Sequence, residues 1–570
     1  MSRLLGLVAL LCIGTGAAAD SATGLEPGDR GTVVTVLEGG RAEEIPLVYL
    51  GTYHDFAGPG FDLHLVELEG PQAERVGVAS GMSGSPVYIG GRLIGALSYR
   101  LGRLPKTAVA GVTPIEDVLA ASRARPPELA HAGDAAIRPI ATPILLSGVV
   151  GNVKSWLAPQ LEELGFVMAS GGAGGSANDI PTKLEPGSPV GVELVRGDMR
   201  MSATGTVTWV DAETIWAFGH PFLGMGRIEM PMVTAEVIHT LPDLAGSVKL
   251  ANVGSVVGAI VEDRQSAIVG RIGQEARMIP IDVSIRGGDY DEQQFHFEAV
   301  QNSRLTPLLV GVVAANALYV NNGHTEKTTM LARGTVRLTG LPELPLEMAF
   351  SGAEDVDPSL AVAGQLFGTL NRLWSNPFQE VDVEGIELSV EVQGQPIGYR
   401  VENIHYDRGP LHPGETLTVQ CVLREHRGGT VTRELSFELP EQLPRSGTLM
   451  LAVSNPAGIE RALGSPLSRR VRSAGDMRSL VRALSDLRSS HRLTGVIYEP
   501  GGTVVARGMS YTELPPTAAK LLSLRATPED RRVGPLVSPL SRAEIELAGP
   551  VHGGGKIRLR VDRGFGTEED

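Results

Sequence analysis

The sequence has 570 residues, with 65 acidic side chains against 50 Lys and Arg and a formal net charge of −15. This acidic balance argues against general nucleic-acid binding, because the phosphates would be repelled. Glycine and proline contribute 71 and 38 residues, while 42% of the chain is hydrophobic. We therefore expect large cores interrupted by many turns, in about three or four domains, and exclude a small disulfide-stapled fold.

The first residues have the features of a secretory signal. Arg3 provides a positive start, residues 4–13 form an apolar stretch, and Ala17-Ala18-Ala19 is a small-residue cleavage site. We expect an exported protein, located in a periplasm or outside the cell, whose mature chain starts near Asp20. Loss of the signal leaves Cys421 as the single cysteine, so we expect no internal disulfide.

In chain order, residues 31–99 have the pattern of compact antiparallel β structure. Alternating or β-branched runs predict strands and a hairpin at 32–37, 45–49, 62–68 and 87–99. Residues 114–123 predict a short helix, and the Arg/Pro-rich stretch 123–127 predicts a boundary.

The middle of the chain mixes helices and strands. Residues 151–165 have a helical pattern broken by Pro159, and 170–176 are a glycine-rich stretch that we interpret as a loop. Strands are predicted at 190–195 and 204–210, and helices at 305–320 and at 358–374, the latter with Asp357 as its cap and Pro358 in its first turn. The 305–320 helix is uncharged but shorter than the ~20 residues that span a membrane.

The sequence pattern changes after Pro377. Alternating strands at sandwich-like spacing are predicted at 386–392, 399–406, 416–423 and 430–439. We expect an immunoglobulin-like β-sandwich over 377–445, followed by an α+β region over 446–570 that contains a helix capped by Asp476.

The sharpest local signal is the run Gly81-Met82-Ser83-Gly84-Ser85-Pro86. A serine between glycines in a tight turn leaves its hydroxyl free and lets nearby N–H groups point at one spot, as an oxyanion hole requires. The N–H groups of Gly81 and Ser83 would form that hole. The alternative is an ordinary Gly/Ser turn between strands.

A nucleophilic serine needs a base within hydrogen-bond reach. His220 has the most constrained setting, because it follows an apolar run and a glycine and precedes Pro221. The alternative is a buried structural histidine. His54, in a polar loop, and His64, which the strand alternation turns outward, are secondary candidates.

Two sets of motifs resemble the SpoIVB family of sporulation serine peptidases. The run 81–86, followed by Leu93-Ile94-Gly95-Ala96, is similar to the family's serine motif. The run 205–208 (Gly-Thr-Val-Thr), leading into Ala217-Phe218-Gly219-His220, is similar to its histidine motif. The resemblance covers about 30–120 and 185–275, and it implies that Ser83 is the nucleophile and His220 its base.

The chain departs from the family pattern in two ways. The family's histidine motif precedes its serine motif, whereas here Ser83 comes first; a triad tolerates this because it is defined by geometry. The family's acidic residue lies shortly before its serine, where Asp62, Glu67 and Glu69 are the choices here. We favour Asp62, at the start of a strand, with simple turn capping as the alternative. No PDZ-like segment accompanies the motifs.

The resemblance implies a mainly β protein with a few helices, whose trypsin-like β-barrel catalytic unit is assembled from two segments. We expect a signal peptide (1–19), a peptidase segment with the serine motif (20–125) and a linker with a helical segment (126–184). A peptidase segment with the histidine motif and a helical extension (185–376), the sandwich (377–445) and the C-terminal α+β region (446–570) follow. The expected function is exported serine endopeptidase; the alternative is an inactive envelope scaffold or binding protein.

We expect a protein or peptide substrate, and no cofactor, metal or nucleic-acid partner. The sequence contains no His-Glu-x-x-His motif and no cysteine pair. It also predicts no stable membrane span once the signal is removed.

Overall fold

The computed structural model describes residues 24–561 apart from 57, 103–104, 123–136, 174–182, 288–289, 322–326, 408, 410, 442–447, 465–466, 473, 487–488, 500–502, 507–508, 512–531 and 535–538. The predicted signal peptide therefore lies outside the described residues. The chain divides into two compact units. The first is built from 1–148, 158–194 and 200–277, and the second from 149–157, 195–199 and 278–570.

The first unit begins with a closed six-stranded antiparallel barrel. Its strands are β1 (Arg30–Thr35), β2 (Glu43–Tyr53), β3 (Leu63–Leu68), β4 (Pro86–Ile89), β5 (Arg92–Leu101) and β6 (Ala108–Pro114). They pair in the order β4-β1-β2-β3-β6-β5, and the β4–β5 hairpin closes the ring. β7 (Ile137–Pro139) extends β5, and two short helices, α1 (Gly70–Val76) and α2 (Ile115–Ala120), complete this part. The predicted strands and hairpin of residues 31–99 are confirmed.

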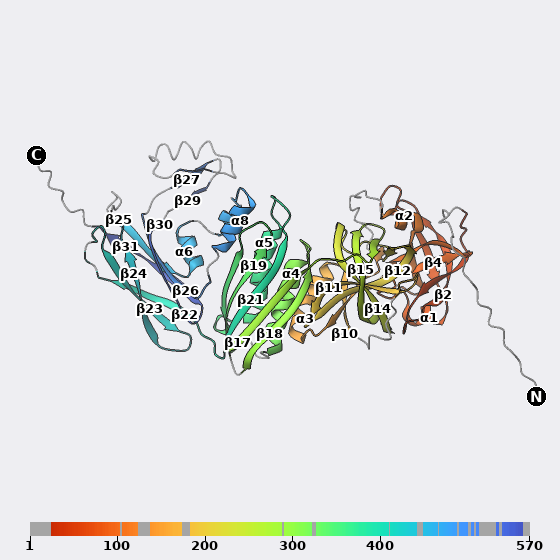
Figure 1. Cartoon of the computed structure of the whole chain (residues 1–570), viewed down its shortest axis with the longest axis horizontal. Coiled ribbons are helices and arrows are strands. Elements are labelled where there is room, and N and C mark those ends of the chain that lie inside the picture. The colour runs from red at the N-terminus through yellow and green to blue at the C-terminus, as the bar shows by residue number, and fades with distance from the viewer. Residues whose placement is uncertain are drawn as a thin grey trace, which may run out of the picture. The chain divides into compact units, whose positions relative to one another are not determined.

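A second ring of six strands follows in the same unit (Figure 1). It contains β11 (Pro189–Gly197), β12 (Arg200–Asp211), β13 (Thr214–Ala217), β14 (Gly226–Leu241), β15 (Val248–Asp263) and β16 (Ile268–Ile272). The order is β11-β14-β15-β16-β13-β12, and a β11–β12 pairing closes the ring. The segment that we expected to be a linker adds three strands: β8 (Thr142–Ser147) pairs with β12, β9 (Phe166–Ser170) pairs with β8, and β10 (Gly172–Ala173) pairs with β15. Between them lies α3 (Gly151–Glu163), with Pro159 inside it.

Alternation of side chains fills each barrel. In the first barrel, Val33, Leu47, Val66, Leu97 and Val112 come from five different strands, and each is at most 1% exposed. Because successive strand residues face opposite sides, alternate residues of these strands reach the shared interior, except where a register slip such as the one between β5 and β6 changes the alternation.

The second unit opens with a five-stranded sheet covered by two helices (Figure 1). The strands are β17 (Met278–Gly287), β18 (Tyr290–Val300), β19 (Thr329–Leu338), β20 (Leu344–Ser351) and β21 (Val383–Gln393), and the helices are α4 (Thr306–Asn321) and α5 (Pro358–Trp374). The Asp357 side chain caps α5 as the sequence predicts. The run 386–392, which we assigned to the sandwich, instead pairs with β17 and β19 of this sheet as part of β21.

The C-terminal sheet combines two regions that we expected to be separate. It contains β22 (Tyr399–Tyr406), β23 (Thr416–Glu425), β24 (Thr430–Glu438), β25 (Thr448–Ser454), β26 (Arg492–Tyr498), β30 (Pro539–Glu546) and β31 (Val551–Arg560). β22 pairs in parallel with β31, so the strands before and after residue 445 share one sheet and one core. Cys421 is a free, buried cysteine in this core.

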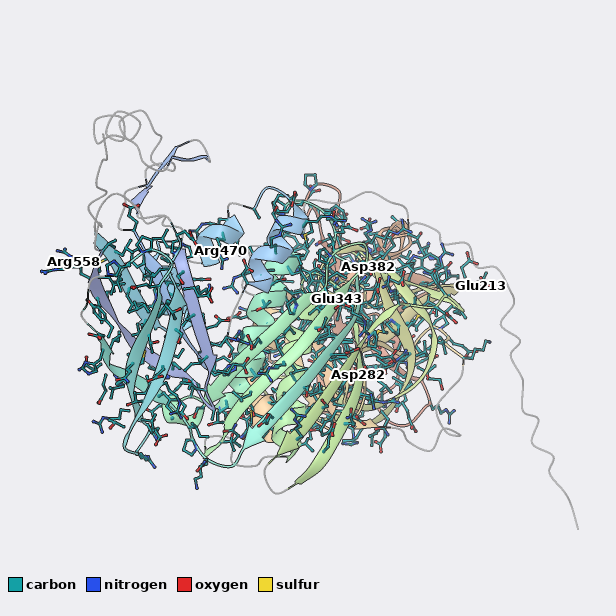
Figure 2. All side chains as sticks on the ribbon, turned by 60° about the vertical axis from the view of Figure 1, so that its left-hand side comes forward. Glu213, Asp282, Glu343, Asp382, Arg470 and Arg558 are labelled. Atoms are coloured by element: carbon teal, nitrogen blue, oxygen red, sulfur yellow. The ribbon has the colours of Figure 1, made fainter. Side chains whose placement is uncertain are left out.

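Short elements complete the C-terminal region. They are α6 (Pro456–Ala462), α7 (Leu467–Arg472), α8 (Met477–Ser485), β27 (Thr503–Ala506), β28 (Met509–Tyr511) and β29 (Arg532–Gly534). α6 packs on β25 and β26, whereas α8 packs on β20, and β27, β28 and β29 form a small sheet of their own. The Asp476 side chain caps α8, as predicted. Charged side chains such as Asp282 and Arg558 project from the outer faces of their strands (Figure 2). The expectation of a mainly β protein with a few helices is confirmed. Among the described helices, none has the length and apolar character needed to cross a membrane.

Candidate active site

The serine motif forms a tight turn just before β4 of the first barrel. Gly81 and Gly84 both have a φ of +93°, in the left-handed region that favours glycine. The Ser85 N–H donates to the Met82 carbonyl at 3.0 Å and closes the turn. A Cβ atom on Gly84 would lie 2.0 Å from the Thr206 carbonyl oxygen. Only glycine fits at this position.

The histidine motif forms a second turn, between β13 and β14 of the second barrel. Phe218 and Gly219 have φ values of 71° and 70°, so two successive left-handed residues present His220 at the strand end. The Thr113 hydroxyl donates to the Gly219 carbonyl at 2.7 Å. A Cβ on Gly219 would lie 2.8 Å from the Cβ of Ala96, so the glycine before the histidine allows a close approach to the first barrel.

The structure brings the two motifs together. The Thr206 N–H donates to the Ser83 carbonyl at 2.8 Å. The Thr206 hydroxyl donates to the Gly81 carbonyl at 2.9 Å, and the Thr208 hydroxyl donates to the Gly84 carbonyl at 2.7 Å. The Gly-Thr-Val-Thr run of the histidine motif therefore holds the serine turn through three hydrogen bonds.

The two predicted reactive side chains are deeply buried. Ser83 has no exposed surface, and His220 is 2% exposed. Neither Ser83 Oγ nor His220 Nε2 has a hydrogen-bond partner among the described residues, so they are not bonded to each other either. A buried polar atom without a partner calls for an explanation, and other described residues such as Ser202 contain one as well. Catalytic hydrogen bonds often form only when substrate is bound.

His220 is held in its neutral form. Burial lowers its pKa to about 4, while main-chain groups of Pro221 and Ile140 act in the opposite direction. His220 Nδ1 lies 2.8 Å from the Pro221 carbonyl oxygen. Because a carbonyl only accepts, Nδ1 carries the hydrogen and Nε2 has the free lone pair that a base needs.

The two N–H groups that we predicted to form the oxyanion hole have no acceptor among the described residues. In the described part of the chain, neither the Gly81 nor the Ser83 N–H donates a hydrogen bond. The neighbouring amides of Met82, Gly84 and Ser85 all donate to main-chain carbonyls. The two free N–H groups are thus the ones that the sequence selected.

The predicted acid, Asp62, has other partners. Its carboxylate accepts the Asp55 N–H at 3.0 Å and lies 2.8 Å from His54 Nδ1, and these contacts hold the pKa of the Asp62 carboxyl below its usual range. His220 Nδ1 is occupied by the Pro221 carbonyl, so Asp62 does not orient this ring in the described structure.

The other candidates also lie elsewhere. Glu69 forms an exposed ion pair with Arg30 at 3.1 Å. Glu67 belongs to β3 of the first barrel. The expectation that His64 points outward is wrong: it is 6% exposed, and its Nδ1 lies 2.9 Å from the Thr52 hydroxyl. His64 lies at the same parity in β3 as the buried Val66 and Leu68, so the alternation of this strand places it on the inner face.

An acidic residue that the sequence analysis missed holds the segment after His220. The Asp263 carboxylate accepts the N–H groups of Phe222, Leu223 and Met225 at 2.7, 2.8 and 3.1 Å. Asp263 is 1% exposed, and this burial raises its pKa while the N–H donors oppose the shift. It fixes the loop rather than the imidazole, and nothing in the local sequence marks it.

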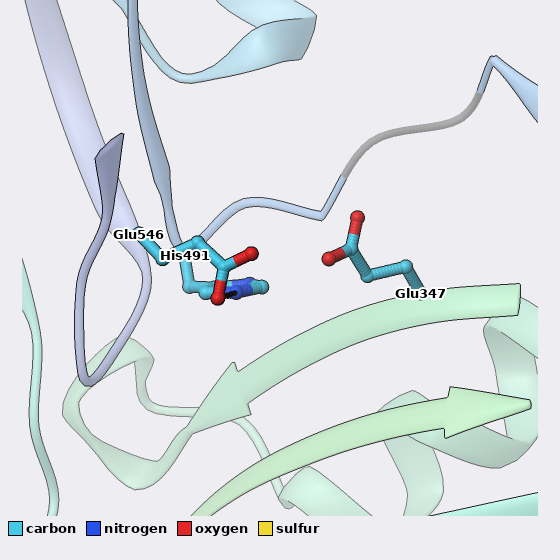
Figure 3. A group of neighbouring side chains, drawn as sticks. All are labelled: Glu347, His491 and Glu546. Atoms are coloured by element: carbon cyan, nitrogen blue, oxygen red, sulfur yellow. Dashed lines mark ion pairs between the residues drawn. The ribbon is translucent and has the colours of Figure 1, made fainter. Parts of the chain in front are cut away.

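A second cluster of titratable groups lies in the other unit. Glu347, His491 and Glu546 have potential ligand atoms within 4.8 Å of one another (Figure 3). The Arg492 guanidinium, however, contacts Glu347 at 2.7 Å and Glu546 at 2.6 Å. Because this arginine already compensates both carboxylates, we interpret the cluster as an ion-pair network and assign it no metal.

Comparison with known proteins gives no relative: no family model, curated protein or solved structure matches the chain.

Proposed function

We propose that the protein is an exported serine endopeptidase of SpoIVB type, with Ser83 as nucleophile and His220 as base. One observation carries the proposal: two motifs from distant parts of the chain interlock around two buried polar atoms that have no partner. The free N–H groups of Gly81 and Ser83 beside the nucleophile support it. The signal-like N-terminus supports export to a periplasm or the cell exterior.

The chemistry follows from these groups. Ser83 Oγ attacks the carbonyl carbon of a peptide bond while His220 Nε2 takes the hydroxyl proton. The oxyanion accepts hydrogen bonds from the two free N–H groups; removal of one such donor costs ~3–4 kcal/mol in a well-studied protease. His220 then gives its proton to the leaving amine, and an acyl-enzyme remains. Water, deprotonated by His220, releases the acyl group as a carboxylate and restores Ser83.

The fold supports a trypsin-like catalytic unit. The first unit contains two six-stranded rings, of which one provides the serine and the other the histidine. The motif order is reversed, which geometry permits. In place of a carboxylate on the imidazole, the Pro221 carbonyl sets the tautomer and Asp263 holds the following loop. We propose that the C-terminal sheet is an immunoglobulin-like module that binds or spaces partners.

The complete burial of Ser83 favours a second candidate, an inactive scaffold that keeps the motif as a structural turn. If the protein is a peptidase, the described form keeps a polypeptide substrate away from the buried Ser83, and a conformational change must expose Ser83 before cleavage.

Cleavage of an unfolded protein such as casein separates the two candidates. We expect wild type to cleave it, and Ser83→Ala and His220→Ala to remain folded but to lose cleavage. Ser202→Ala is the matched control, because Ser202 is also buried with an unpartnered hydroxyl. Equal cleavage by wild type and Ser83→Ala would favour the scaffold.

A further inference from the structure

A buried lysine lies against the serine turn. Lys249, near the start of β15, is 3% exposed. Its N–H donates to the Ser80 carbonyl at 3.1 Å, and its side chain would contact a Cβ on Gly81 at 3.2 Å. Its Nζ donates to the Thr35 hydroxyl at 2.7 Å. The serine mechanism proposed above leaves this amine unused.

Among the residues that the structure describes, no charged group compensates Lys249. Burial alone lowers its pKa, to about 7, with no contribution from any ionisable neighbour. The described groups beside its side chain are Thr35 of β1 and Gly81 of the turn, and its cross-strand neighbour on β14 is Thr240. All three are uncharged, so the amine changes its charge near neutral pH without a compensating partner among them.

Lys249 is connected to the serine turn through two hydroxyl groups. The Ser85 hydroxyl lies 2.9 Å from Thr35 Oγ1 and 2.6 Å from the Met82 carbonyl oxygen. A hydroxyl has one hydrogen, so Ser85 donates fully to only one of these two acceptors at a time.

The charge of Lys249 biases that choice. A neutral amine accepts the Thr35 hydrogen, which makes Thr35 Oγ1 a stronger acceptor for Ser85. An ammonium instead donates to Thr35 Oγ1 and makes it a poorer second acceptor. The Ser85 hydrogen then favours the Met82 carbonyl.

The Met82 carbonyl belongs to the same peptide group as the Ser83 N–H. A hydrogen bond to the carbonyl polarises the peptide group and strengthens its N–H as a donor. We propose that Lys249, acting through these two hydroxyl groups, is a positioning residue for the oxyanion-binding N–H of Ser83. This role rests on the peptidase function proposed above.

Selective labelling isolates the peptide group concerned. With carbonyl-¹³C Met and ¹⁵N Ser, an NMR correlation of N–H with the preceding carbonyl reports only Met-Ser pairs. The sequence contains four, at 1–2, 82–83, 201–202 and 509–510. Ser83→Ala identifies the peak of interest by its disappearance, and the 201–202 pair, in a strand, is an internal reference.

We expect the 82–83 peak of wild type to titrate with a midpoint near the pKa of about 7 of Lys249, and its carbonyl carbon to move upfield as the pH rises. Lys249→Met and Thr35→Val should abolish the titration, and Thr35→Val should resemble wild type at low pH. Lys183→Met, at an exposed lysine, is the control. A peak that does not move in wild type, or that titrates unchanged in Lys249→Met, overturns the proposal.

The rate of labelling by a fluorophosphonate provides the catalytic readout. In wild type we expect it to fall roughly threefold to tenfold between pH 6 and pH 8, a fraction of the loss of a whole oxyanion donor. The profiles of Lys249→Met and Thr35→Val should be flat. A wild type that is not labelled at any pH overturns the peptidase function. A titrating 82–83 peak would then still support the link from Lys249 to this peptide group.

Discussion

The Ser83 carbonyl accepts the Thr206 N–H at 2.8 Å, so the predicted nucleophile is tied directly to the strand that leads toward the predicted base. Residues far apart in the chain thus build one turn, and the geometry of Ser83 depends on both barrels of the first unit.

The close approach at Gly84 predicts a large cost for a side chain there. Gly84→Ala would place a Cβ 2.0 Å from the Thr206 carbonyl oxygen and 2.4 Å from the Phe218 nitrogen. We expect the free energy of unfolding to fall by about 3 kcal/mol or more. Gly90→Ala is matched, because Gly90 also has a positive φ but open space around it, and it should cost only about 1 kcal/mol. Equal costs in urea unfolding would contradict the interlocked turn.

Because Asp263 holds the loop that follows His220, we expect substitution of Asp263 to reduce both stability and casein cleavage. Asp263→Asn replaces one acceptor oxygen by an amide that cannot accept from the loop N–H groups, at a cost of about 1–3 kcal/mol of stability. Casein cleavage should fall as well, because the loop follows His220 directly. Asp282→Asn, at an exposed residue outside this unit, should change neither quantity. Full activity of Asp263→Asn would show that the loop does not position the histidine.

Replacement of the buried Lys249 should raise the free energy of unfolding by an amount that depends on pH. Its folded pKa of about 7 lies below the ordinary value of 10.5, so the unfolded chain binds more protons between these values and wild type loses stability as pH falls through this window. Lys249→Met should be more stable than wild type by on the order of a few kcal/mol at pH 7. Urea unfolding at pH 7 and pH 10 should show the advantage shrinking; an equal difference at both would argue for a charged, solvated amine.

The buried His220 should make the free energy of unfolding depend on pH below neutrality. Burial lowers its pKa from 6.5 to about 4, so wild type loses stability as pH falls from 6.5 toward 4, because the unfolded chain then binds the extra proton. His220→Gln should lose less over this range, by on the order of 2–3 kcal/mol. His54→Gln, at an exposed histidine, is the comparison. Parallel pH profiles for wild type and His220→Gln in denaturant titrations would contradict the burial of a neutral imidazole.

Local patterns predicted the local features well. The strands of the first barrel and the caps at Asp357 and Asp476 follow from alternation and capping chemistry, which act over a few residues. The glycines at 81, 84 and 219 were predicted beside the reactive side chains, and each stands where a positive φ or a close approach requires it.

The sequence did not reveal features that depend on contacts between distant residues. The run 386–392 alternates like a sandwich strand, yet its partners are β17 and β19, because strand pairing is decided between distant residues. Asp263 and Lys249 look like ordinary strand residues. A partial signal did exist for Lys249, which shares the alternation of the buried Ala251 and Val253.

The most direct test of the central claim is to treat the full chain with a fluorophosphonate and locate the adduct by mass spectrometry. We expect one adduct, on Ser83, which disappears in Ser83→Ala and in His220→Ala and persists in Ser202→Ala. An adduct on another serine, or no adduct on any residue of wild type, would contradict it.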